Sequence, residues 1–150
     1  MNLVVDTGAL LSLACSRYFN ILAKEHSFLV TPAVDEELKQ FSQYHDLLGK
    51  KAQEIMVLQL QSILPHKLLV LPLEKAEIEV FSAAKEKGYL ALTDDVHAAR
   101  IVFEKAKILT KPSFYLLLLL YNKRKISKED FIDDIKKILS QRNWLSGSLW

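Results

Sequence analysis

Short apolar runs alternate along the chain with longer segments of helical periodicity, and this alternation restricts the possible folds more than any other feature. The apolar runs lie at residues 2–5, 28–31, 68–73, 89–93 and 107–110. The helical segments between and after them cover residues 9–22, 33–43, 46–63, 74–87, 95–106, 113–122 and 128–141. Strands that are joined by helices need crossover connections, which produce a parallel sheet with helices on both faces. Strands buried on both faces are continuously apolar, as these are.

The pattern therefore predicts an α/β fold, a three-layer α/β/α sandwich around a central parallel sheet. In a doubly wound sheet of order 3-2-1-4-5, the first and fourth strands are neighbours. The chain has 150 residues and shows no internal repeat or linker, so we expect one domain over residues 1–150.

Several residues have the chemistry of helix ends. Thr31 can cap the helix that begins at Pro32, because proline at the first helical position loses no needed N–H group. Gly88 is suited to terminate the helix over 74–87. Ser127 and Asp130 have nearly the spacing of a capping box at the start of the last helix.

Charge and cysteine content give only broad limits. The net charge is +2, but residues 111–150 contain eight Lys/Arg against four acids. This asymmetry indicates an anionic partner only weakly, since a solvated helix face explains it equally well.

The single cysteine, Cys15, permits no disulfide within the chain and suits a reducing compartment. The apolar run 114–121 is too short for a bilayer, which needs about 20 residues, so we expect a buried helix and a cytoplasmic protein without a membrane segment.

Acidic residues follow three of the predicted elements. Asp6 comes directly after the first strand, Asp94 and Asp95 follow the fourth, and residues 35–37 (DEE) lie in the first turns of the helix after the second strand. In open parallel sheets, ligands bind beyond the carboxyl ends of the strands, where the strand order reverses. We expect these three segments to bring carboxylates to one pocket.

Most of these acids also have a structural explanation. Residues 35–37 can complement a helix dipole, and Thr93 or Asp94 can cap the next helix. Asp6 has few such explanations. Clustered carboxylates repel each other and are stable when a hard cation such as Mg²⁺ or Mn²⁺ neutralises them. The combination favours metal-assisted hydrolysis of a phosphodiester.

The chain contains three segments in the order and context of known motifs: LVVDTGALLSLA (3–14), VTPAVDEEL (30–38) and LALTDDVHAAR (90–100). It thereby resembles the PIN-domain family, which includes the VapC-type toxin ribonucleases. The resemblance implies Asp6, Glu37 and an acid of the Asp94-Asp95 pair as catalytic metal ligands, and both members of that pair fit. Glu36, adjacent to Glu37, is a secondary candidate. Glu77 is another, because Ala76-Glu77 stands where one branch of the family has a Gly-Glu motif.

The resemblance further implies a PIN-like ribonuclease that cleaves RNA with Mg²⁺ or Mn²⁺ as the toxin of a toxin–antitoxin pair. Thr7 and Ser113 are then expected to hydrogen-bond a metal-bound water or a phosphate. Arg100 and Lys111 are expected to hold the RNA backbone, together with Lys123, Arg124 and Lys125. A homodimer and an antitoxin protein are the expected partners.

One departure from the family leaves an alternative open. Many members have a fourth acid after the last strand, but the segment LTKPSF (109–114) has none. A catalytically reduced PIN-like domain that binds nucleic acid or protein is therefore the alternative. A receiver-like phosphoacceptor domain fits less well, because the third predicted strand ends without an aspartate. An aspartic protease is excluded, since its Asp-Thr-Gly motif requires an all-β scaffold.

Overall fold

The computed structural model describes residues 1–142, in which five parallel strands form one sheet of order β3-β2-β1-β4-β5. The strands are β1 (Asn2–Val5), β2 (Ser27–Val30), β3 (Gln61–Ser62), β4 (Leu90–Leu92) and β5 (Thr110–Lys111). The predicted fold class and strand order are confirmed.

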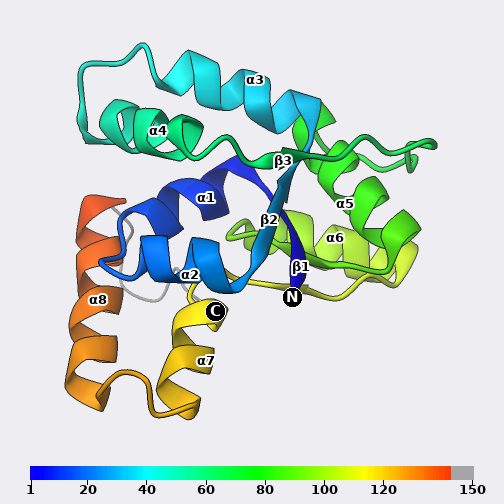
Figure 1. The fold of residues 1–150 in the computed structure, drawn as a ribbon. Coiled ribbons are helices and arrows are strands. Elements are labelled where there is room, and N and C mark those ends of the chain that lie inside the picture. Colours follow the sequence, from blue (N-terminus) through cyan, green and yellow to red (C-terminus); the bar gives the residue numbers. More distant parts are fainter. Residues whose placement is uncertain (143–150) are drawn as a thin grey trace.

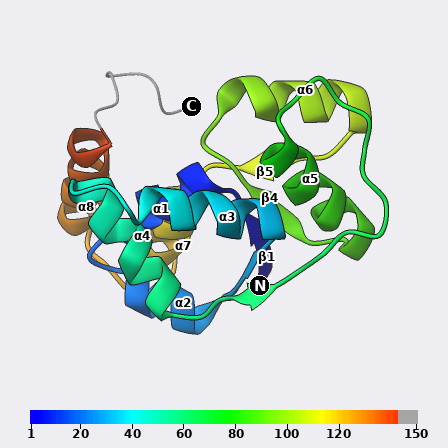
Figure 2. The ribbon, with the colours of Figure 1, turned by 90° about the horizontal axis from the view of Figure 1, so that it is seen from above.

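Helices cover both faces of this sheet (Figure 1). They are α1 (Thr7–Ala14), α2 (Phe19–Glu25), α3 (Pro32–Phe41), α4 (Leu47–Val57), α5 (Lys75–Lys87), α6 (Val96–Ala106), α7 (Tyr115–Asn122) and α8 (Lys128–Gln141). Helices α5 and α6 lie on one side of the strands, and α1, α2 and α7 lie on the other. Helices α3 and α4 pack side by side beyond the carboxyl ends of the strands, as Figure 2 shows from above.

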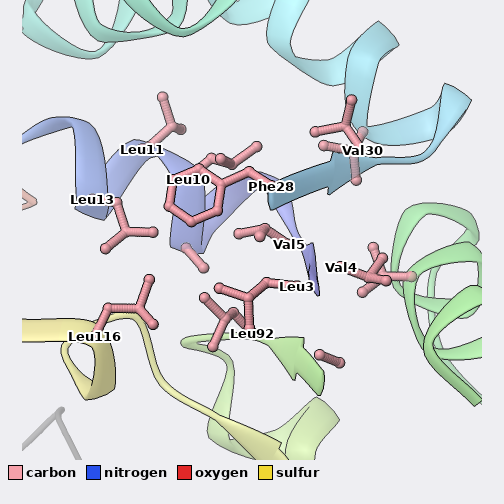
Figure 3. Packing of buried hydrophobic residues seen from close by; sticks show 14 of the residues in the cluster. Leu3, Val4, Val5, Leu10, Leu11, Leu13, Phe28, Val30, Leu92 and Leu116 are labelled. Atoms are coloured by element: carbon pink, nitrogen blue, oxygen red, sulfur yellow. The ribbon is translucent and has the colours of Figure 1, made fainter. Parts of the chain in front are cut away.

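The central strand β1 is buried from both sides. Leu3, Val4 and Val5 have no exposed surface. Figure 3 shows Leu3 and Val5 pointing toward α1, while Val4 points toward α5. This follows from the alternation of side chains along a strand, and it explains why the run is continuously apolar.

The third strand was predicted wrongly. Residues 68–73 were expected to form it, but the sheet edge is β3, in which Gln61 and Ser62 pair with Leu29 and Val30. Leu69, Leu71 and Leu73 do pack on the core, while Leu68 and Val70 are exposed. The backbone N–H of Leu69 donates to Ser82 Oγ on α5 at 2.9 Å. The continuous apolar run indicates correctly a segment that packs on the core, but this segment lies against a helix and does not pair with a strand.

Three other boundaries also differ from the prediction. The segment 9–22 is divided into α1 and α2 by a turn at residues 15–18. The helix expected over 46–63 ends at Val57, since Gln59 has a positive φ of 51° and the chain then enters β3. Lys107 has a φ of 58° and ends α6, so β5 starts later than expected.

The helix ends predicted at Thr31, Gly88 and Ser127 are confirmed, but α6 is capped by Asp95 and not by Thr93 or Asp94. Thr31 Oγ1 accepts from the backbone N–H of Val34, and Pro32 occupies the first position of α3. Gly88 ends α5 in the left-handed region, with φ 69°. Ser127 Oγ accepts from the backbone N–H of Asp130 at 3.0 Å.

The apolar run 114–121 forms most of α7, as expected. Leu116, Leu117 and Leu120 are buried in the core. Across residues 1–142, none of the helices has both the length and the apolar character needed to cross a bilayer.

Helix α8 is attached to the turn between α1 and α2 through Asp134. This carboxylate is buried and accepts from Ser16 Oγ and, at 3.1 Å, from the backbone N–H of Arg17. The Arg17 guanidinium lies 3.8 Å from the same carboxylate. The position of α8 therefore depends on one buried carboxylate that accepts two hydrogen bonds and forms one ion pair.

Asp134→Ala is expected to destabilise the protein by about 3 kcal/mol, because it leaves the buried donors of Ser16 and Arg17 without their acceptor. Urea unfolding followed by circular dichroism measures this. The neighbouring Asp133 is exposed, so Asp133→Ala is the matched control and should change stability by less than about 0.5 kcal/mol. Equal losses in the two variants would contradict the assignment.

Candidate functional site

The central strands deliver two acidic segments to the same place. Val5 is paired with Leu92, and the backbone N–H of Asp6 donates to the carbonyl of Leu92 at 3.1 Å. Asp6 and the segment 93–95 therefore leave the sheet side by side, at its carboxyl edge.

A pocket of about 450 Å³ opens at this edge. Six carboxylates line it from four segments: Asp6, Glu37, Glu74, Glu77, Asp94 and Asp95. Its other lining residues among those described are Thr7, Gly8, Leu11, Phe41, Ala76 and Arg142. The predicted acids Asp6, Glu37, Asp94 and Asp95 thus share one pocket, which we call the acid pocket.

Asp6 has a structural role that the sequence reasoning missed. It is the N-cap of α1, and its Oδ1 accepts from the backbone N–H of Ala9 at 2.8 Å. Burial is the largest cause that raises the pKa of Asp6 to about 7; hydrogen bonds from Thr93 and Ala9 oppose the shift, and the charges of Asp94 and Glu77 contribute to it. A charge on Asp6 is therefore costly unless a cation neutralises it.

Asp94 and Asp95 differ in their surroundings. Asp94 Oδ1 accepts from the backbone N–H of Ser113 at 2.7 Å, whereas Asp94 Oδ2 is buried with no hydrogen-bond partner within residues 1–142. Asp95 Oδ1 caps α6 by accepting from the backbone N–H of Ala98 at 3.0 Å. A buried carboxylate oxygen without a partner is costly, so Asp94 is the better candidate of the two to face a cation.

Glu77 lies in the same pocket at the start of α5. Burial raises its pKa, and the neighbouring charges of Asp95 and Glu74 act in the same direction. Its side chain also accepts from the backbone N–H of Glu74, with which it forms a capping box. Sequence reasoning missed Glu74, although its spacing from Glu77 is that of a capping box.

Glu37 is held by a residue that was expected to contact substrate. Thr7 Oγ1 donates to Glu37 Oε1 at 2.6 Å, and this bond joins the start of α1 to the middle of α3. Glu36, the neighbouring secondary candidate, is exposed and is not among the residues that line the acid pocket.

The other predicted substrate contacts lie elsewhere. Arg100 lines a separate, mainly apolar hollow on α6 with Val96 and Phe103. Lys111 is exposed, and its Nζ lies 5.1 Å from the centre of the Tyr115 ring. Ser113 is buried beneath Asp94, and its hydroxyl has no hydrogen-bond partner in the described part of the chain.

Arg142 was missed altogether. It ends α8 and reaches the acid pocket from the far end of the chain, where its Nε donates to Ser12 Oγ at 3.1 Å. Burial lowers its pKa, and the charges of Asp94 and Asp6 oppose this shift. No local pattern in the sequence connects Arg142 to acids more than forty residues away.

The chemistry of the pocket suits a hard divalent cation. Its acids offer carboxylate oxygens, the ligands that Mg²⁺ and Mn²⁺ prefer, and among residues 1–142 Asp94 Oδ2 has no hydrogen-bond partner. Within residues 1–142, no three His, Cys, Asp or Glu side chains are gathered as a finished metal-binding group. One carboxylate oxygen of each of Asp6, Asp94 and Glu37 accepts a hydrogen bond from the protein. These side chains therefore line one pocket but do not converge on one point.

The pKa of Asp6 predicts a pH-dependent stability. The folded protein retains a proton on Asp6 up to about pH 7, whereas the unfolded chain loses it near the ordinary value of 3.8. Stability of the metal-free protein is therefore lost as the pH rises between these values. Asp6→Asn removes this charge and keeps the cap, so it should raise Tm by roughly 5 °C at pH 8 and by less at pH 4.5.

Thermal unfolding in EDTA checks this expectation. Asp46 also caps a helix, through the backbone N–H of Gly49 at 2.8 Å, but it is exposed. Asp46→Asn is therefore the matched control, and it should shift Tm little at either pH. A lower Tm for Asp6→Asn at pH 8 would refute the argument.

Comparison with known proteins gives a consistent result. The family model described as "DUF3368: PIN domain" matches residues 2–150. A solved structure of a PilT N-terminus domain protein from the hyperthermophilic archaeon Sulfolobus solfataricus P2 is similar in fold, with a TM-score of 0.50 and 18% sequence identity over 79% of this chain and 92% of that chain. No curated protein matches the sequence significantly. Since the family model spans nearly all of the sequence, this chain belongs to the PIN-domain family.

Proposed function

We propose that this PIN domain is a metal-dependent endoribonuclease that hydrolyses RNA phosphodiester bonds with Mg²⁺ or Mn²⁺. PIN domains are generally nucleases. The observation that carries the proposal is the acid pocket itself, in which the carboxyl ends of β1 and β4, the middle of α3 and the start of α5 bring six carboxylates together.

Asp6, Glu37, Asp94 and Asp95 would hold the cation, with Glu77 as a secondary ligand. When bound, a divalent ion in such a site lowers the pKa of a water molecule and offsets negative charge on the phosphate. The protein's own residues hold the acidic side chains in position. Thr7 holds Glu37, the backbone N–H of Ser113 holds Asp94, and the cap at Ala9 fixes Asp6.

A catalytically reduced PIN domain that binds RNA without cleaving it is the second candidate. Two observations favour it. The segment after β5 has no acid, and within the described residues the carboxylates do not form a finished metal-binding group. The two candidates differ in whether RNA is cut, so one experiment separates them.

Incubation of the purified protein with a mixed single-stranded RNA pool should give cleavage with Mn²⁺ and none with EDTA. Asp6→Asn and Asp94→Asn should each reduce the rate by roughly a hundredfold or more, because both remove a charged ligand from the acid pocket. Gel analysis of end-labelled RNA measures the rate.

Glu37 and Glu36 provide a matched pair of variants in this assay. Glu37→Gln should slow cleavage, while Glu36→Gln, which alters an exposed neighbour outside the pocket lining, should keep the wild-type rate. RNA binding without any cleavage would favour the reduced domain. Cleavage that persists in Asp6→Asn and in EDTA would reveal a contaminating nuclease or a different site.

We further propose, from the resemblance to VapC-type toxins, that the protein acts as a toxin, forms a homodimer and is inhibited by an antitoxin protein. Induced expression in a bacterial host should then arrest growth for the wild type but not for Asp6→Asn, since the arrest depends on RNA cleavage. Colony counts after induction measure this. Equal growth of both strains, at equal protein levels, would count against a toxin role.

A further inference from the structure

Arg142 is the feature of the acid pocket that the proposed ligand set leaves unexplained. Among the described residues that line this pocket, it has the one positively charged side chain, and it faces six carboxylates. It comes from the opposite end of the chain to Asp6, so its presence there depends entirely on how α8 is placed.

The guanidinium is held by two connected hydrogen bonds. Its Nε donates to Ser12 Oγ at 3.1 Å, and Ser12 Oγ donates to the carbonyl of Gly8 at 3.0 Å. Helix α8 is fixed in turn by the buried Asp134 and by Ile138, which is 1% exposed. The position of Arg142 is therefore defined by its own hydrogen bond to Ser12 and by the contacts that the middle of α8 makes through Asp134 and Ile138.

Gly8 leaves a space between Arg142 and Asp6. A Cβ atom at residue 8 would lie 3.7 Å from Arg142 Nη2 and 3.8 Å from Asp6 Oδ1. Because glycine has no side chain, nothing from residue 8 separates the guanidinium from the carboxylate. Both groups border the same open volume of the acid pocket.

An RNA phosphate that enters this pocket meets strong repulsion from the carboxylates, which a single divalent ion offsets only in part. A guanidinium keeps its charge at all ordinary pH values and can bind two phosphate oxygens at once. We propose that Arg142 is a substrate-binding residue that holds a phosphate of the RNA at the acid pocket. This inference rests on the proposed ribonuclease function.

The contrary interpretation is that Arg142 only neutralises the acids and competes with the metal ion. The two interpretations predict opposite results for Arg142→Ala. A substrate-binding residue, when removed, weakens RNA binding and slows cleavage, even though the loss of its positive charge favours Mn²⁺ binding. A competing cation, when removed, tightens Mn²⁺ binding and accelerates cleavage.

The experiment measures RNA affinity by fluorescence anisotropy with a labelled single-stranded RNA pool, in Ca²⁺ so that cleavage is suppressed. Arg142→Ala should weaken binding about tenfold, and it should lower the slope of log affinity against log salt by about 0.7, the value for one lost phosphate contact. Arg142→Lys should weaken binding but keep the slope, because the charge remains. Lys105→Ala, at an exposed cation on α6 outside the pocket lining, should change neither.

Two further measurements separate this inference from the function on which it rests. Mn²⁺ affinity by calorimetry gives the concentration that saturates each variant, and at saturating Mn²⁺ the cleavage by Arg142→Ala should be reduced mainly through a higher KM. Suppose that the wild type cleaves RNA. The role of Arg142 is then refuted, and the ribonuclease function stands, if Arg142→Ala has the wild-type RNA affinity and salt slope. The same conclusion follows if this variant binds Mn²⁺ more tightly and cleaves RNA faster. If the wild type neither binds nor cleaves RNA, both fall.

Discussion

The parallel pairing of β1 with β4 is the constraint on which the rest of this structure depends. It places Val5 beside Leu92, so that Asp6 and Asp94 leave the sheet at adjacent points although 88 positions separate them in the chain. The pairing is itself a result of burial, since Leu3, Val4 and Val5 need apolar cover on both faces and only a central strand receives it. The hydrophobic core thus determines where the acids meet.

Bringing these acids together is energetically unfavourable, and several hydrogen bonds within the protein offset part of this cost. The backbone N–H of Ala9, the hydroxyl of Thr7 and the backbone N–H of Ser113 each satisfy one oxygen of a pocket acid. Asp94 Oδ2 remains buried without a partner in the described chain, and burial raises the pKa of Asp6. Unfavourable features of this kind, in a fold whose other features are stabilising, are expected at functional sites. Arg142 offsets part of the charge from the opposite end of the chain.

Much of the fold could be predicted because its signals are local. Thr31, Gly88 and Ser127 act within a few residues of their own positions, and their roles were predicted correctly. The prediction of the fold was wrong where one local sequence pattern is compatible with two tertiary arrangements. The apolar residues 68–73 have the composition of a buried strand, yet they pack across α5, because Ser82 and the core offer them partners there. A short apolar run indicates burial, but it does not define the surface that receives it.

The features of the candidate site can likewise be separated into those that the sequence predicts and those that depend on the tertiary structure. The sequence by itself determined the α/β class, the strand order and the acids that end β1 and β4, because apolar runs and strand-terminal carboxylates are readable from adjacent residues. Only the tertiary structure decided that Thr7 holds Glu37 and that Arg100 lies outside the acid pocket. It also decided that Asp95 caps a helix, while one oxygen of Asp94 has no partner among the residues that the structure describes. It alone also decided that Arg142 joins that pocket. The physical reason is that side-chain contacts between distant segments depend on how helices pack, and helix packing is decided by the whole core and not by any neighbouring residue.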